Sequence, residues 1–210
     1  DYVLMWGWGV MNPVAIQEAV NIRYPMENFI GVWWWSGSEN DVLPAGDKAT
    51  GYKALAFHAV NSDFPIFDDI QKFVVDRGKA AGAGDQIGTV LYNRGMYNAM
   101  LITEAARTAQ AIAGKSNISQ ADMIKGFEAL EMTEEKMAAL GLPGFGPSFS
   151  VSCENHGGDG MVAVAQWDAG AGKWSIVSDF QASDMSVIQP LIDADSGAFA
   201  SENNLSPNCN

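Results

Sequence analysis

The sequence has 210 residues, a formal net charge of -13 at pH 7 and a pI near 4.3. This charge argues against nucleic acids and anionic membrane surfaces as partners, because phosphate binding needs clustered basic residues and only 12 are scattered along the chain. With 48% hydrophobic residues the chain can bury a large core. No apolar run reaches the roughly 18 residues that a membrane-spanning helix requires.

The chain opens with the pattern of a strand, a helix and a second strand. Residues 2–5 and 29–34 are short apolar runs. Between them, Asn12 and Pro13 predict a helix start, since asparagine caps free amides and proline loses no hydrogen bond at the first helical position. Helical spacing extends this helix over residues 13–23. The unit is a βαβ crossover, so we expect parallel strands and a right-handed connection.

Both of these predicted strands end in tryptophans. Trp8 follows the first strand, and Trp33, Trp34 and Trp35 close the second, just before Ser36. Ligands of open parallel sheets lie beyond the carboxyl ends of the strands, and consecutive strand residues point to opposite faces. We therefore interpret the tryptophans as a wall of a binding cleft. The competing interpretation is that each ring is ordinary core.

Further along, the hydrophobic pattern predicts a mixed series of elements. They are a strand at 52–60, helices at about 65–78, 90–113, 119–130 and 133–140, strands at 148–152, 161–167 and 174–177, and a last helix at about 186–193. Glycine-rich turns join the late strands, so we expect a small antiparallel element there. In the long helix, Leu91, Ala105 and Ile112 belong to the expected buried stripe.

The two cysteines and two histidines allow few chemical roles. Cys153 and Cys209 can pair in an oxidising compartment or remain two inert thiols, and we favour the disulfide. His58 and His156 lie far apart in sequence with no partner at ligand spacing, so we expect no metal site. No phosphate-binding loop or dinucleotide glycine pattern occurs, and we expect no cofactor.

Three charged side chains are candidates for a site. Glu39 and Asp41 follow the second strand beside the tryptophans, and Arg94 lies at the start of the long helix. As an enzyme, the chain would be a glycoside hydrolase or a glycan-binding domain with a sugar stacked on tryptophan and Glu39 as one of its carboxyl groups. As a binder, Glu39 would be a polar anchor and Arg94 an anchor for an anionic group. The plain alternatives are a solvated acidic loop and a surface arginine.

An ordered series of motifs runs through nearly the whole chain. It consists of Asp-Tyr-Val-Leu-Met-Trp-Gly-Trp-Gly at the start, Phe-Ile-Gly-Val-Trp, Gly51-Tyr52-Lys53-Ala54, Tyr97-Asn98-Ala99, Gly146-Pro147 and Trp167-Asp168. This series resembles the C-terminal half of the type I periplasmic solute-binding proteins of ABC transporters, in the branched-chain amino acid and amide group. We expect the sequence to be a piece whose beginning lies elsewhere, with a missing N-terminal half of the same protein.

The resemblance implies an α/β fold that is part of a two-lobed type I periplasmic-binding-protein fold, with parallel βαβ units and a small antiparallel element. Residues 1–57 would form second-lobe units, 58–145 first-lobe return helices, and 146–210 second-lobe antiparallel strands and the C-terminal tail. It also implies a periplasmic, extracytoplasmic protein without enzymatic activity. Such a protein closes around a small-molecule solute between its lobes and delivers it to an ABC permease.

The family pattern is not followed at one position. In its amino-acid binders an aromatic at the place of Trp8 contacts the ligand, and an acid after the glycine of the next strand holds the ammonium group. The corresponding position here is near Trp33, where no acid stands. A wall of Trp8, Trp33 and Trp34, with Ser36, Glu39 and Arg94 as polar contacts, favours a flatter or more apolar solute such as an aromatic acid or an amide.

Overall fold

The computed structural model describes residues 1–32, 36–82, 84–206 and 209. The chain forms two compact units. Unit 1 consists of residues 1–100, 133–148 and 162–180, and unit 2 consists of residues 101–132, 149–161 and 181–210. The predictions made for Trp33, Trp34 and Trp35 fall outside the described residues.

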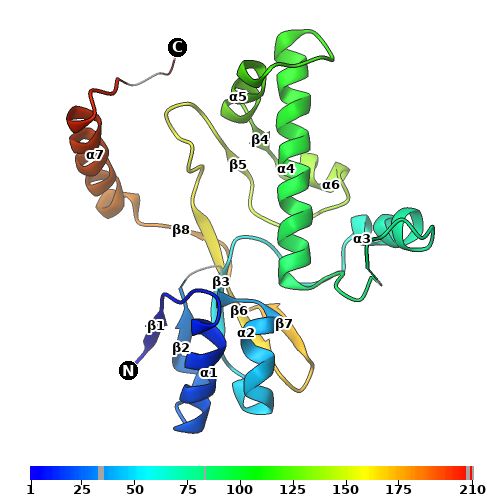
Figure 1. The fold of residues 1–210 in the computed structure, drawn as a ribbon, viewed down its shortest axis with the longest axis vertical. Helices are drawn as coiled ribbons and strands as arrows, with labels where there is room; N and C mark the ends of the chain where they lie inside the picture. Colours follow the sequence, from blue (N-terminus) through cyan, green and yellow to red (C-terminus); the bar gives the residue numbers. More distant parts are fainter. Residues whose placement is uncertain (33–35, 83, 207–208, 210) are drawn as a thin grey trace. The chain divides into compact units, whose positions relative to one another are not determined.

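A mixed sheet forms the centre of unit 1 (Figure 1). Its neighbouring strands are, in order, β1 (Val3–Met5), β2 (Phe29–Gly31), β3 (Lys53–Ala56), β6 (Met161–Asp168) and β7 (Lys173–Ile176). The first three are parallel, with Val3 opposite Phe29, while β3 with β6 and β6 with β7 are antiparallel. The expected α/β fold, with a parallel βαβ unit and an antiparallel element, is confirmed.

Helix α1 (Met11–Asn21) connects β1 to β2 and begins two residues before the predicted start. The turn at Gly7–Gly9 lets the amides of Met11 and Asn12 bond back into it, so the helix needs no asparagine cap. At the other end, Arg23 takes a positive φ of 60°, and the Tyr24 amide donates to the Ala19 carbonyl at 2.9 Å. This is the left-handed ending that glycine usually supplies.

The other elements are short except for two helices. They are α2 (Glu39–Val42), α3 (Pro65–Ile70), α4 (Val90–Ala113), α5 (Gln120–Glu128), β4 (Glu131–Met132), α6 (Glu134–Ala139), β5 (Phe149–Ser150), β8 (Gln181–Ala182) and α7 (Met185–Glu202), with 3-10 turns at Met26–Asn28 and Leu43–Ala49 and a π turn at Gln71–Val75. Helix α4 has the predicted bounds. Helix α7 extends beyond the predicted 193, because the Asp195-Ser196-Gly197 segment continues the helix instead of ending it.

The core of unit 1 lies between the sheet and the helices α1 and α2. Ile16 from α1 and Val42 from α2 are fully buried, and α1 contacts α2. Aromatic rings extend this core along the sheet. The Tyr52 ring meets Phe29 and Trp174 edge-on, with centroids 5.5 and 6.0 Å apart. Such aromatic contacts contribute about 0.5–1.5 kcal/mol each beyond area burial, so the strands that carry the loops of unit 1 are firmly held.

In unit 2, α4 and α5 approach each other through small residues. A Cβ on Gly126 would collide with the Ala105 carbonyl oxygen and would lie 2.7 Å from the Ala109 Cβ. The expectation that Leu91, in the unit 1 part of α4, and Ile112, in its unit 2 part, are buried is wrong, because they are 42% and 53% exposed. Ala105 of the expected stripe is buried, as is Ala109, so α4 meets α5 through its alanines.

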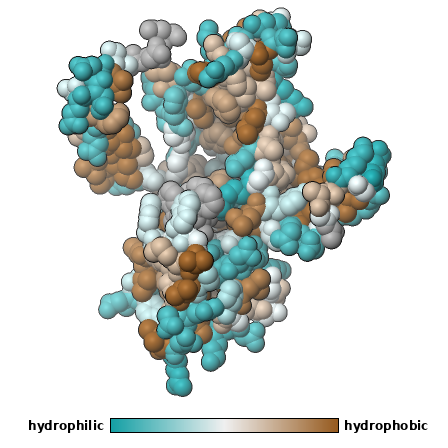
Figure 2. Space-filling model, in the orientation of Figure 1, coloured by the Kyte–Doolittle hydropathy of each residue, from teal (hydrophilic) through white to brown (hydrophobic). Residues whose placement is uncertain are grey.

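The predicted disulfide between Cys153 and Cys209 is present, with the two Cα atoms 5.4 Å apart. It joins a loop of unit 2 to the end of the chain. Helix α7, just before that end, has no buried residue, and Val187 and Leu191 are among its exposed apolar side chains. Figure 2 shows a hydrophobic area on the surface of this helix. None of the helices described here is long and apolar enough to cross a membrane.

Candidate functional site

A cluster of buried polar side chains in unit 1 gathers where the parallel strands end. Its members, each at most 7% exposed, are Asn12, Ser36, Ser38, Asp41, His58 and Arg94. The first follows β1, the next three follow β2, His58 follows β3, and Arg94 belongs to α4. Buried polar groups cost free energy unless they are hydrogen-bonded. Buried polar side chains that gather in one region must therefore be hydrogen-bonded either to one another or to a ligand.

Asp41 is bonded within the protein. One carboxylate oxygen accepts from the Asn12 side-chain amide at 3.2 Å. The other accepts from the Ser38 amide at 2.9 Å and from the Ser38 hydroxyl at 2.7 Å. These bonds tie the first turn of α1 to the loop after β2. The predicted alternative of a solvated Asp41 is wrong, because the side chain is buried and serves as a structural link.

Glu39 lies at the start of α2 and bonds to a different helix. Both of its carboxylate oxygens lie 3.2 Å from the Val90 amide, which donates to them at the first turn of α4. A carboxylate at a helix N-terminus is stabilised by the unsatisfied amides and the helix dipole. Burial nevertheless raises the pKa of Glu39 above its usual value, since partial desolvation outweighs these hydrogen bonds.

Arg94 lies one turn further along α4 and is buried rather than at the surface. Its guanidinium carbon lies 5.6 Å from the centroid of the Phe57 ring, in a cation–π arrangement. Burial lowers the pKa of Arg94 to about 10, although the charges of Asp41 and Glu39 oppose this shift. The group remains a cation at pH 7. The structure therefore brings the predicted anchors Glu39 and Arg94 into one electrostatic environment.

His58 is a neutral imidazole beside this cluster. Its Nδ1 lies 2.7 Å from the Ala59 carbonyl, and because a carbonyl only accepts, Nδ1 carries the hydrogen. The ring stacks on Phe145, with centroids 5.4 Å apart. Burial lowers the pKa of His58 to about 4. Its Nε2 is buried and has no hydrogen-bond partner among the described residues, so it is an available acceptor.

The turn that holds Ser36 is fastened to the sheet by Tyr52. The Tyr52 hydroxyl donates to the Ser36 carbonyl at 2.7 Å, and both residues are fully buried. Gly31 makes room for this contact, because a Cβ there would collide with the Ser36 and Tyr52 hydroxyls. Because residue 31 is a glycine, the end of β2 can pack directly against the turn that holds Ser36. The loop that carries Glu39 is thus held at one end by Tyr52 and near the other by Asp41.

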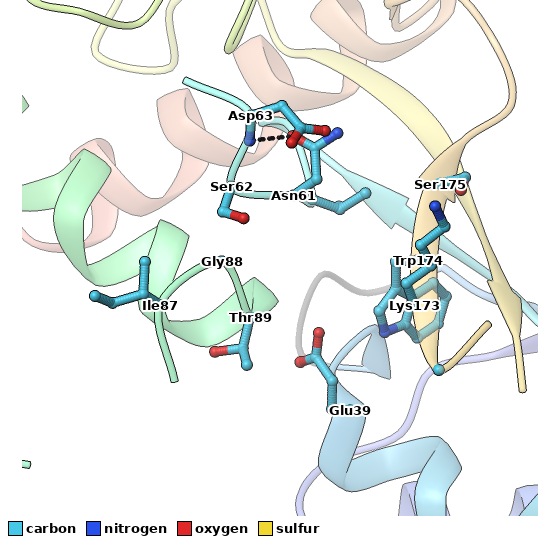
Figure 3. Close-up of a pocket in the computed structure, with 12 residues that line it drawn as sticks. Glu39, Asn61, Ser62, Asp63, Ile87, Gly88, Thr89, Lys173, Trp174 and Ser175 are labelled. Atoms are coloured by element: carbon cyan, nitrogen blue, oxygen red, sulfur yellow. Dashed lines mark hydrogen bonds between the residues drawn. The ribbon is translucent and has the colours of Figure 1, made fainter. Parts of the chain in front are cut away.

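A hollow of about 370 Å³ in unit 1 borders Glu39 (Figure 3). Its remaining lining comes from the connection after β3, the segment before α4 and the start of β7, and consists of Val60, Asn61, Ser62, Asp63, Ile87, Gly88, Thr89, Gly172, Lys173, Trp174 and Ser175. The buried indole Nε1 of Trp174 has no partner in the part of the chain that is described. A volume near 300–1,000 Å³ with a few polar groups is the size of a small-ligand site.

The other predicted site residues are placed differently. Trp8 is 60% exposed and does not belong to the lining of this hollow, while Ser36 is fully buried. Trp33 and Trp34 lie outside the described residues. Sequence reasoning missed Tyr52, Asn12 and Trp174. Asn12 was interpreted as a helix cap and Trp174 as a strand residue, and neither pattern signals a contact with a residue far away in the sequence.

Of the comparisons with known proteins, only the one with solved structures finds matches to this chain. No protein-family model and no curated protein matches the chain. Among solved structures, the crystal structure of an ABC transporter permease from the Pseudomonas fluorescens group is 36% identical, with a TM-score of 0.90 over 100% of this chain and 50% of that one.

Two further structures share the fold at lower identity. A branched-chain amino acid ABC transporter from Thermus thermophilus with bound valine is 19% identical, with a TM-score of 0.64 over 88% of this chain and 47% of its own. A solute-binding protein of an ABC transporter from Rhodopseudomonas palustris HaA2, in complex with p-hydroxybenzoic acid, is 14% identical, with a TM-score of 0.53 over 83% and 43%. The chain spans about half the length of these proteins.

Proposed function

Because this chain has the fold of about half of an ABC-transporter substrate-binding protein of the branched-chain amino acid type, we propose that it forms the solute-binding part of such a protein. In this proposal the protein is extracytoplasmic, holds a small organic solute and presents it to an ABC permease. The rest of the protein, which the half-length match leaves outside this chain, completes the enclosure. The chain carries out no chemistry.

One observation supports this function most directly. The buried polar cluster lies beyond the carboxyl ends of β1, β2 and β3, which is where open parallel sheets bind their ligands. Glu39 and Arg94 bring opposite charges to it, and the His58 Nε2 adds an acceptor. A solute that carries both a donor and an anionic or carbonyl group matches these charges. Amino acids, amides and aromatic acids are the classes that do so.

The tryptophans have a defined role in this proposal. Trp8, Trp33 and Trp34 provide flat apolar surface for the body of the solute, and Ser36, Glu39 and Arg94 fix its polar end. The 60% exposure of Trp8 in this chain leaves its ring accessible to a solute or to the rest of the protein. In this proposal residues 1–57 and 146–210 belong to the second lobe, and residues 58–145 are the helices that return to the first lobe.

The bonding of Asp41 argues against a glycoside hydrolase built on the loop that carries Glu39. A glycoside hydrolase needs two carboxyl groups that flank the scissile bond and are available for proton transfer or attack. Asp41, the carboxyl group nearest to Glu39 in sequence, is buried and already accepts three hydrogen bonds from Asn12 and Ser38. Glu39 therefore has no second carboxylate of the required kind in the loop that carries it.

A titration tests this function. The purified chain is titrated with valine, aliphatic amides and p-hydroxybenzoate while tryptophan fluorescence and thermal stability are followed. We expect at least one solute to bind saturably without being consumed, and to raise stability by about 2.7 kcal/mol at 100 times its Kd. Glu39→Gln should weaken that binding, whereas Glu27→Gln, which changes an exposed acid outside the cluster, should not. Failure of every solute class, or equal binding by both variants, would contradict the proposal.

A further inference from the structure

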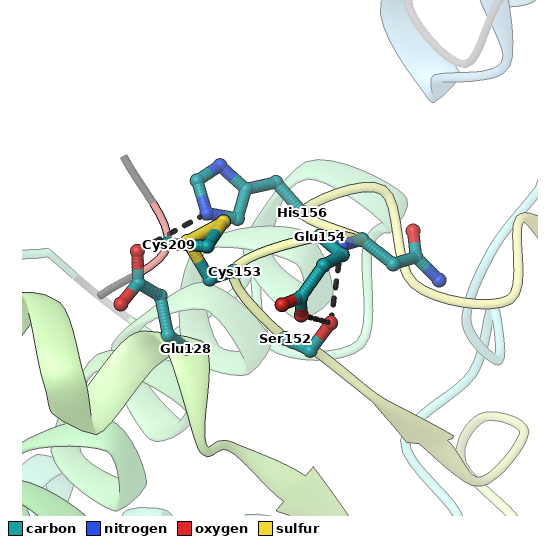
Figure 4. The surroundings of a disulfide bond; sticks show 7 residues. Glu128, Ser152, Cys153, Glu154, His156 and Cys209 are labelled. Atoms are coloured by element: carbon teal, nitrogen blue, oxygen red, sulfur yellow. Dashed lines mark hydrogen bonds and ion pairs between the residues drawn. A yellow bond between two sulfur atoms is a disulfide. The ribbon is translucent and has the colours of Figure 1, made fainter. Parts of the chain in front are cut away.

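We propose that reduction of the Cys153–Cys209 disulfide turns this corner of unit 2 into a zinc site formed by Cys153, Cys209, His156 and Glu128. The potential ligand atoms of Glu128, Cys153 and His156 all lie within 4.8 Å of one another. Cys209 adds a fourth donor, because its sulfur is bonded to that of Cys153. Figure 4 shows the four side chains converging.

The loop that carries two of these donors has a fixed shape. Cys153 and His156 are separated by two residues, the same separation that brings two cysteines onto one zinc ion in many structural sites. The Asn155 amide donates to the Ser152 hydroxyl at 3.1 Å, and the Asn155 side chain donates to the Gly158 carbonyl at 3.0 Å. These bonds close the loop without using the Cys153 or His156 side chains. The two donors are thus positioned before any ion binds.

Glu128 contributes from the end of α5. One of its carboxylate oxygens lies 3.4 Å from the Nε2 of His156, so both groups already face the same point. His156 is largely exposed, while Glu128 and Cys153 are half-buried. An ion can therefore reach the cluster from solvent. Two sulfurs, one imidazole nitrogen and one carboxylate oxygen form a donor set that suits tetrahedral Zn²⁺.

The oxidation state of the sulfurs decides whether the ion binds. In the disulfide neither sulfur is a thiolate, which leaves Glu128 and His156 as the only strong donors of this cluster. A trialkylphosphine and one water molecule convert the disulfide into two thiols and a phosphine oxide. Binding of Zn²⁺ then releases the two thiol protons and forms two zinc–sulfur bonds. On this proposal, the expectation from sequence that the chain has no metal site is wrong for the reduced form.

The ion would join the same two segments that the disulfide joins. Helix α7 has no buried residue, so apolar packing contributes little to holding the C-terminal tail within unit 2. The cross-link at Cys209 is therefore a principal attachment of that tail. Zinc preserves this attachment under reducing conditions, which loss of the disulfide alone would abolish.

Cobalt(II) provides the test, because thiolate ligation gives it a charge-transfer absorption that carboxylate or imidazole ligation lacks. The whole chain is titrated with Co²⁺ and then Zn²⁺, oxidised and after phosphine treatment, and proton release is measured. We expect the reduced chain to bind one ion with the thiolate band and to release two protons per zinc. The oxidised chain should show neither.

Variants distinguish the four-ligand site from adventitious binding to thiols. His156→Ala and Glu128→Gln should each weaken zinc binding to the reduced chain by at least about 10-fold, the low end of what even outer-shell partners contribute. Glu154→Gln is the matched control, because it lies in the same loop and its carboxylate bonds to Ser152. Wild-type affinity in both ligand variants, or absence of the thiolate band in the reduced wild type, would overturn the proposal.

Discussion

Tyr52→Phe removes the hydrogen bond that joins the Ser36 turn to the sheet and leaves the aromatic ring in place. The lost hydroxyl donates at 2.7 Å to the Ser36 carbonyl, and both residues are fully buried. Depriving a buried carbonyl of its donor costs about 1–3 kcal/mol. With a urea m-value of about 2 kcal/mol/M, the unfolding midpoint should fall by about 0.5–1.5 M.

Tyr24→Phe is the matched control for this change. The Tyr24 hydroxyl also donates to a backbone carbonyl at 2.7 Å, that of Asp1, but at the surface. Its loss should cost less than about 0.5 kcal/mol. Urea unfolding is followed by tryptophan fluorescence, since Trp174 lies against the Tyr52 ring. Equal midpoint shifts in the two variants would refute the argument that burial gives the Tyr52 bond its weight.

Two further changes test the packing of unit 2 and the charge of the site. Gly126→Ala should destabilise unit 2 by about 1–3 kcal/mol, because the new Cβ meets the Ala105 carbonyl oxygen. Gly95→Ala should instead stabilise α4 by about 0.4–1 kcal/mol, because a Cβ there meets nothing within 4 Å. Urea unfolding followed by circular dichroism measures both changes, and shifts of the same sign would contradict this prediction. Because burial raises the pKa of Glu39, protonation favours the folded chain, so the wild type should gain stability relative to Glu39→Gln as the pH falls through that raised pKa, with the full gain below the usual value of 4.5. Urea midpoints measured from pH 7 to 4 test the sign, and a difference that does not change with pH would disprove it.

The first half of the fold follows closely from local sequence signals. The apolar runs before Trp8 and Trp33, with a helix between them, specify a parallel βαβ unit, and the structure has it. The bounds of α4 follow from its periodicity. The start of α1 did not, because asparagine before proline usually marks a cap. Here the Asn12 side chain instead donates to Asp41, 29 residues away.

The site is less accessible from sequence, for a physical reason. The position of Glu39 after a strand end predicts a polar anchor for a solute, whereas the partner that its carboxylate has in the structure is the Val90 amide of a helix 51 residues further on. Arg94 has the sequence context of a surface residue, and only the fold places it over Phe57. Long-range contacts of this kind depend on how helices return to the sheet, which periodicity does not encode.

Whether Cys153 and Cys209 form a disulfide depends on the redox state of the compartment, which the sequence of this chain does not reveal. Two cysteines fix a single intramolecular partner, yet their oxidation state is not written in the sequence. The nearby donors of Glu128 and His156 could be recognised only once α5 and the loop after β5 were placed in unit 2.

The central claim is that a solute binds beyond the carboxyl ends of the parallel strands. Amide chemical shifts of the labelled chain, recorded while the best solute of the panel is added, test it most directly. We expect saturable changes over residues 36–41 and 57–61 and none at the opposite edge of the same strands, at Asp1, Glu27 and Thr50. Changes confined to that opposite edge would contradict the claim.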